Sequence, residues 1–248
     1  MSALVIKLIA CLTMLLDHIG YSWPALAVLR APGRLSFPLF VFLMTEGFRH
    51  TSSRPRYALR LGVFALLSQI PFSLLLSGRP FFPKGNVIFT LLLSMLLLWQ
   101  LEYFRQRRLH LLGLVLPLAA FFLCWRYILR IDYGAEGILL ALAIYYFGGR
   151  PLLLLLGVTV SVFYSILISW VGTVVHLLLG QQDVFVRVEG WNLMRVFALP
   201  SVGLMWAYNG KPGPHPASPL GRKASQLGFY AFYPAHMLAL WLLKSVIR

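Results

Sequence analysis

The chain has 248 residues, of which 59% are hydrophobic and only 12% are charged. A soluble domain of this size needs more charge to cover its surface, so the composition excludes an ordinary globular protein and indicates a polytopic membrane protein. The formal net charge of +15 would suit a nucleic-acid binder. However, most of the cations stand in short loops between apolar runs, where they meet lipid headgroups, and no nucleic-acid motif accompanies them. We therefore expect a lipid bilayer, and no nucleic acid, as the partner.

The apolar runs predict an all-α helical bundle with about nine transmembrane helices, since a span needs roughly 20 mostly apolar residues. No small-residue cleavage site follows the first run, so we interpret it as the first membrane helix and not as a signal peptide. No polar stretch is long enough for a second domain, and residues 1–248 are predicted to form one integral membrane domain. The expected helices are 4–22, 35–50, 57–77, 86–103, 109–126, 134–148, 151–172, 192–208 and 226–246.

Three further features concern the organisation of the chain. Residues 173–191 fit either an interfacial helix or an excursion outside the membrane. Cys11 and Cys124 lie inside apolar runs without a metal or redox motif, so we interpret both as small buried apolar side chains. The two densest Lys and Arg clusters, in 49–60 and 105–108, are cytoplasmic if the N-terminus is cytoplasmic, and we predict that orientation.

The first apolar run carries three ionisable residues, Lys7, Asp17 and His18. A charge near the bilayer centre costs at least about 2.5–3.5 kcal/mol, so such residues usually face a partner or a cavity. At 100° per residue, Lys7 and His18 share one helix face about 16 Å apart, while Asp17 points about 100° away from it. The alternative is that all three side chains only reach the membrane interfaces.

The second run begins after Arg34 and contains Glu46 and Arg49. If it runs antiparallel to the first helix, Arg34 reaches the depth of His18, and Glu46 reaches the depth of Lys7. We therefore predict two ion pairs, Asp17 with Arg34 and Lys7 with Glu46. They would either form part of a site or only lock the two helices together.

Polar groups recur in two later runs. Asp132 and Glu136 stand one turn apart at the start of the run 134–148. Acids at a helix N-terminus are favoured by the helix dipole, which explains Asp132 well, but Glu136 lies deeper. His236 falls near mid-membrane in the last run, two residues after Pro234, and is interpreted as either a hydrogen-bonded packing residue or a catalyst.

Five segments, in order along nearly the whole chain, resemble the TraX family of bacterial inner-membrane proteins, which is named for N-terminal acetylation of a conjugative pilin. They are IKLIACLTMLLDHIG, GRLSFPLFVFLMTEGFRHT, NVIFTLLL, DYGAEGILLALAIYYF and FYAFYPAHMLAL. That family is similar in turn to membrane acyltransferases of the acyltransferase-3 superfamily, which carry a basic residue, ten intervening residues and a histidine on the first helix. Lys7 and His18 have this spacing, although the basic residue is usually Arg.

The resemblance implies an acyltransferase of the bacterial inner membrane that moves an acyl group from cytoplasmic acetyl-CoA or another acyl-CoA to an amine or hydroxyl. The acceptor is left open among a pilin, a peptide, a glycan and a lipid. A histidine with an ordinary pKa near 6.5 suits the removal of the acceptor proton. We expect His18 as this base, Asp17 as the group that orients it, Arg34 at the oxyanion, and no metal. The donor phosphates are expected at the inner cations, near Lys7, Glu46, Arg49 and the cluster at 54–60.

Three alternatives remain at this stage. A proton-coupled transporter or flippase would line its path with acids and histidines, but we find no internal repeat of the kind typical of transporters. A non-catalytic assembly protein would use the ion pairs only to hold helices together. A metallohydrolase would need ligands at a recognisable spacing, and no HExxH motif occurs. The residues that the transporter would use are Asp17, His18, Glu46, Glu136 and His236.

Overall fold

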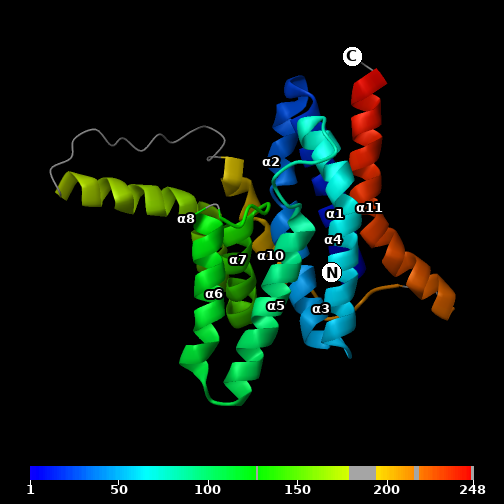
Figure 1. The fold of residues 1–248 in the computed structure, drawn as a ribbon. Helices are drawn as coiled ribbons and strands as arrows, with labels where there is room; N and C mark the ends of the chain where they lie inside the picture. The colour runs from blue at the N-terminus through cyan, green and yellow to red at the C-terminus, as the bar shows by residue number, and fades with distance from the viewer. Residues whose placement is uncertain (127, 179–193, 215–217, 247–248) are drawn as a thin grey trace.

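The computed structural model describes residues 1–126, 128–178, 194–214 and 218–246, and these ranges form a helical bundle without a β-strand (Figure 1). The predicted all-α fold is therefore confirmed. The elements are α1 Ala3–Ser22, η1 Pro24–Leu29, α2 Arg30–Gly33, α3 Ser36–His50, α4 Arg54–Ser77, α5 Val87–Gln106, α6 His110–Trp125, α7 Gly134–Phe147, α8 Pro151–Leu178, η2 Met194–Ala198, α10 Ser201–Trp206 and α11 Pro219–Val246.

Four stretches within the described residues are long and apolar enough to cross a membrane: α1, the joined stretch Pro24–His50, α4 and α5. Shorter apolar helices accompany them, and the whole set is consistent with the predicted count of about nine. The segment predicted as one helix over 192–208 instead comprises the short helices η2 and α10, with Pro200 between them. Of the ambiguous segment 173–191, the first part continues α8 to Leu178, and the rest lies outside the described residues.

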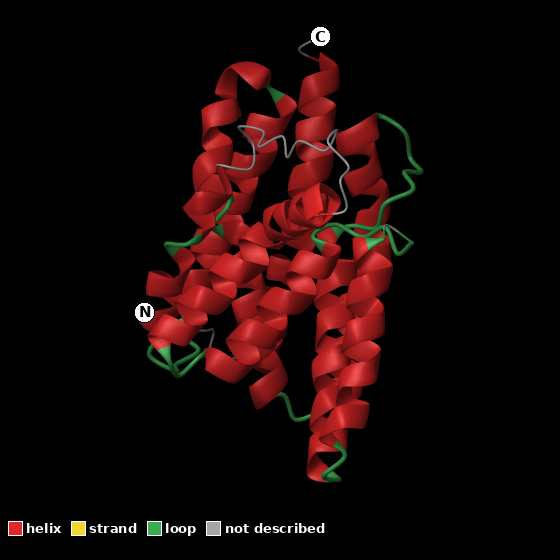
Figure 2. Ribbon diagram, turned by 90° about the vertical axis from the view of Figure 1, so that its left-hand side faces the viewer, coloured by secondary structure: helices red, strands yellow, loops and turns green. Residues whose placement is uncertain are grey.

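The core lies where α1, α3, α4, α5 and α7 meet, and α11 packs against α4 and α1 on one side of it (Figures 1 and 2). Ile6, Leu39, Met95 and Leu140 are fully buried at its centre. Large apolar side chains also cover the outside of α4 and α6, where water would make them costly and lipid does not. Cys11 and Cys124 are buried and unpaired, as expected.

Backbone hydrogen bonds fix the start of α1 to the loop that precedes α11. The amides of Ala3 and Leu4 donate to the carbonyls of Lys211 and Pro212 at 2.9 and 3.1 Å, and the Asn209 amide donates to the carbonyl of Met1 at 2.9 Å. These contacts satisfy N–H groups at the start of α1 that have no partner within the helix. The first residues of the chain and the loop before α11 are therefore held together by backbone hydrogen bonds.

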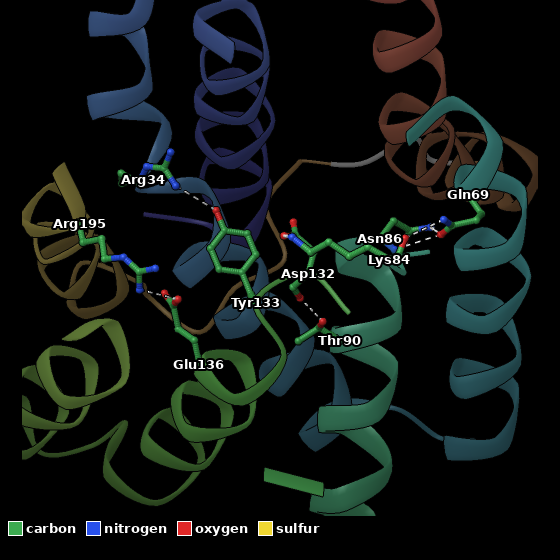
Figure 3. Close-up of polar contacts among 9 residues, drawn as sticks. All are labelled: Arg34, Gln69, Lys84, Asn86, Thr90, Asp132, Tyr133, Glu136 and Arg195. Atoms are coloured by element: carbon green, nitrogen blue, oxygen red, sulfur yellow. Dashed lines mark hydrogen bonds and ion pairs between the residues drawn. The ribbon is translucent and has the colours of Figure 1, made fainter. Parts of the chain in front are cut away.

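A buried amide joins α4 to the start of α5 (Figure 3). Asn86 is fully buried, and its side-chain oxygen accepts from the Ile88 amide at 3.0 Å, which caps α5. Its Nδ2 donates to the Ala65 carbonyl at 2.7 Å and to Gln69 Oε1 at 3.0 Å. This one side chain therefore satisfies polar groups on two membrane helices.

We expect Asn86→Ala to lower the free energy of unfolding by about 2 kcal/mol or more, because it removes a helix cap and leaves buried acceptors without donors. Chemical denaturation in detergent micelles measures the change. The matched control is Gln106→Ala at the exposed end of α5, which should stay within about 0.5 kcal/mol. Equal effects of the two variants would contradict the role assigned to Asn86.

Candidate active site

Asp17, near the end of α1, lies between two arginines that follow the helix. Its Oδ1 lies 3.1 Å from Arg34 Nη2 and 3.7 Å from Arg30 Nε. The predicted Asp17–Arg34 ion pair is thus confirmed. Gly33 permits it, because a Cβ at this position would lie 2.5 Å from the Asp17 Cβ. The close approach of α2 to α1 therefore brings two cations to one carboxylate.

His18 does not contact Asp17 through a hydrogen bond in the described structure; its partner is His236 of α11. His18 Nδ1 and His236 Nε2 are 2.8 Å apart, and the ring centroids are 5.0 Å apart, so the two imidazoles meet edge to edge. The Phe232 ring stacks against His236, with the centroids 4.8 Å apart. His236 is only 7% exposed. The carboxylate expected to orient His18 is thus replaced by a second imidazole, and His236 belongs to the same site as His18.

The predicted Lys7–Glu46 ion pair is wrong. Glu46 Oε1 instead lies 2.8 Å from Nη1 of Arg49, one turn further along α3, and that arginine also donates to the carbonyl of Tyr145 at 2.6 Å. A partner at i+3 on the same helix is within reach without any helix rotation, which explains the preference. Lys7 lies over the ring of Phe229 instead, with its Nζ 5.6 Å from the centroid.

A cavity of about 380 Å³ lies between α1, α3, α4, α5 and α11 and includes Lys7 in its wall. Its lining is mostly apolar, but polar side chains gather where α1 starts and α3 ends. These are Lys7, His50, Thr51, Arg60 and Gln226. Tyr233 also lines the cavity, and its ring stands edge-on to His18, with the centroids 6.5 Å apart. The cavity thus lies along the face of α1 that the sequence assigned to Lys7 and His18, but it reaches only from Lys7 to Met14, and His18, Asp17 and Arg34 do not line it.

A second polar cluster lies on the far side of Arg34 (Figure 3). Arg34 Nη1 donates to the Tyr133 hydroxyl at 3.4 Å, and Arg195 Nη1 lies 3.1 Å from Glu136 Oε2. A small cavity of about 30 Å³, the volume of roughly one water molecule, lies among these side chains. Glu136, expected as a deep polar residue, is buried and paired here.

Asp132 joins this region to α5 and to the loop before it by two contacts. Its carboxylate lies 2.6 Å from Lys84 Nζ, and its carbonyl accepts a hydrogen bond from Thr90 (Figure 3). Asp132 therefore has an ion-pair partner besides its favourable position at the start of α7.

Sequence reasoning missed two parts of this arrangement. Arg195 was included in an apolar run without being assigned a role, although a lone arginine among apolar residues is a signal for a buried acidic partner. The His18–His236 contact joins residues 218 positions apart, and no pattern in one sequence specifies it. Within the described ranges, no three His, Cys, Asp or Glu side chains are arranged to hold a metal ion.

The sequence is similar to known proteins over nearly its whole length. The family model described as "TraX protein" matches residues 2–244. The chain is also similar to the "Probable fimbrial assembly protein FimC, serogroup H1" of Dichelobacter nodosus, with 29% identity over 266 aligned residues that cover 100% of this chain and 97% of that protein. No solved structure matches.

Double-mutant cycles should separate the observed ion pair from the one that does not form. We expect Asp17→Asn and Arg34→Gln to show a coupling energy of about 1–3 kcal/mol, because the two side chains touch. The matched pair, Lys7→Met and Glu46→Gln, should couple by less than about 0.5 kcal/mol. Unfolding in detergent micelles measures both cycles, and equal coupling energies would contradict the described pairing.

Proposed function

The chain belongs to the TraX family, and from this premise we propose that it is a membrane acyltransferase. It moves an acyl group, in the first instance acetyl, from acyl-CoA to an amine or hydroxyl. The observation that carries the proposal is the cavity whose lining includes the cations Lys7 and Arg60 and also Tyr233, the ring of which contacts His18. Such a cavity suits a donor with an anionic head and a reactive tail.

The cationic end is the proposed site of the donor phosphates. Lys7 and Arg60 line it, and point charges of this kind attract phosphate oxygens. With the N-terminus in the cytoplasm, this end faces the compartment that contains acyl-CoA. Glu46 and Arg49, expected at the donor as well, do not line the cavity but bind each other and α7. In our proposal they hold the end of α3 in place beside the donor.

The proposed reacting groups are a base and a cation that lie beyond the lining of the large cavity, His18 next to Tyr233 and Arg34 in the wall of the small cavity. His18 is the proposed general base, since an imidazole takes a proton from an amine or hydroxyl near neutral pH. Arg34 is proposed to stabilise the oxyanion that forms when the thioester carbonyl is attacked. Its Nε is buried and has no hydrogen-bond partner in the described structure, which leaves a donor for this purpose. Asp17 then holds the guanidinium in position.

The acceptor is proposed from the relative with which the chain aligns over its full length. That protein's name refers to fimbrial assembly, and we propose an envelope substrate such as a pilin, acylated at an amine, as the first acceptor to test. The surrounding partner is the bilayer, and the proposed location is the bacterial inner membrane.

A non-catalytic role in assembly is the second candidate, and two observations favour it. The name of the relative mentions assembly but no enzyme activity. In addition, the acids of the bundle at Asp17, Glu102 and Glu136 are all engaged in ion pairs between helical elements. An assembly protein of this kind would keep its function without His18, whereas an acyltransferase would not.

We expect His18→Gln to lower the turnover of acetyl-CoA by about 10²- to 10⁴-fold, because the general base is lost. Release of free CoA thiol from acetyl-CoA by the protein in proteoliposomes measures the rate, with water or an added amine peptide as the acceptor of the acyl group. The matched control is His110→Gln, at the exposed start of α6, which should retain the native rate. Full activity of the His18 variant would show that His18 is not the general base.

We expect Lys7→Met to raise the KM for acetyl-CoA by about tenfold with little change in kcat, because it removes uniform binding of the donor. Lys7→Arg should keep the native KM, and Lys211→Met, in an exposed loop, serves as the charge-matched control. The same thiol-release assay reports both constants. A fall in kcat with an unchanged KM would instead assign Lys7 to the reacting end.

A further inference from the structure

The hydrogen bonds of His236 determine which of its nitrogens carries the proton. His236 Nδ1 lies 2.7 Å from the carbonyl oxygen of Phe232, one turn earlier in α11. A carbonyl oxygen can only accept, so Nδ1 must carry a hydrogen and donate it. Rotation of the ring is opposed by the Phe232 ring, which stacks against it, and by the contact of Nε2 with His18 at its edge. The orientation of His236 is therefore fixed by its surroundings.

The proton on Nδ1 leaves Nε2 of a neutral His236 with a lone pair. This atom faces His18 Nδ1 at 2.8 Å, and the bond between them needs one hydrogen, which His18 must supply. His18 then carries its proton on Nδ1, and its Nε2 has the free lone pair. A charged His236 would reverse the bond, but no ion pair reaches His236 among the described residues, and a lone imidazolium inside an apolar bundle is costly.

We propose that His236 is a positioning residue that holds His18 in the tautomer of a base, with Nε2 free to take a proton. The effect of His236 on the reaction rate rests on the proposed acyltransferase function, whereas its effect on the tautomer of His18 does not. The three groups form a chain in which Phe232 accepts from His236 and His236 accepts from His18. In serine hydrolases an aspartate performs the same task for the catalytic histidine, and here a neutral imidazole backed by a carbonyl does so.

The reaction balances with one proton moving through His18. As the acceptor amine or hydroxyl attacks the thioester carbonyl, its proton passes to Nε2 of His18. The tetrahedral intermediate then breaks the bond between the acyl carbon and sulfur, and the CoA thiolate takes that proton from Nε2. His18 returns to its neutral form, the products are the acylated acceptor and free CoA thiol, and His236 keeps its own proton on Nδ1. While His18 is charged, the lone pair of His236 stabilises the imidazolium.

The first test reads the tautomer directly and needs no substrate. In protein labelled with ¹⁵N-histidine, the nitrogen shifts of His18, assigned by their loss in His18→Gln, should show a protonated Nδ1 and an unprotonated Nε2. His236→Phe keeps a ring between Phe232 and His18 but removes the acceptor, so the His18 signal should move toward the other tautomer. His236→Gln offers an amide oxygen in place of Nε2 and should restore the native signal.

The second test uses the thiol-release assay with acetyl-CoA. We expect His236→Phe to lower kcat by about 10- to 100-fold, as loss of an orienting partner does elsewhere, with an unchanged KM for the donor. His236→Gln should recover most of the lost kcat. A purely structural role would not produce this parallel between tautomer and rate.

The two tests fail separately. A native His18 protonated on Nε2, or a His236→Phe variant with the native tautomer and native kcat, overturns the positioning role. A native protein that releases no CoA thiol from acetyl-CoA with either water or an amine peptide as the acceptor overturns the proposed function, and the nitrogen shifts alone then decide the role of His236. The whole proposal is supported if His236→Phe loses both the native His18 tautomer and the native kcat, and His236→Gln recovers both.

Discussion

The contact between Asp17 and its two arginines determines how the N-terminal third of the molecule is arranged. A carboxylate at membrane depth needs a counter-charge, and Arg30 and Arg34 supply it from the turn that joins α1 to α3. That turn is folded into η1 and α2, and Gly33 lets it approach α1 to within contact of Asp17. The pair thus sets the return of the chain into α3 and, because His18 is the next residue, also fixes its depth and direction.

Ionic and neutral polar contacts lie side by side in this bundle. Asp17, paired with Arg34, is followed directly by His18, which contacts His236. Lys84, paired with Asp132, stands two residues before the buried amide of Asn86. Burying a neutral hydrogen-bonded group costs less than burying a charge, and each of these acids has a counter-charge within contact.

Much of the fold followed from periodicity and length, because runs of roughly 20 apolar residues leave few alternatives in lipid. The Asp17–Arg34 pair was predictable for the same reason, since a short connection makes two helices antiparallel neighbours and sets residue depth. Lys7 and Glu46 satisfy the same depth argument and yet do not pair. Two residues at the same depth pair only if their helices are rotated so that the side chains face each other, and depth does not determine that rotation. Glu46 pairs instead with Arg49, which lies one turn away on the same helix. The His18–His236 contact depends on the rotation of two helices from opposite ends of the chain, which one sequence does not specify.

The choice of a histidine to hold His18 has a physical reason. A carboxylate beside His18 would bring a second negative charge to the depth at which Asp17 already needs two arginines. Such a charge costs several kcal/mol unless it is paired, and a further arginine would disfavour the cation that His18 becomes when it takes a proton. An imidazole whose Nδ1–H is bound to the Phe232 carbonyl offers an acceptor without any net charge. The site can thus orient His18 within lipid by using one backbone carbonyl and no further charge. Asp17 then remains available to hold Arg34, the cation proposed to stabilise the oxyanion.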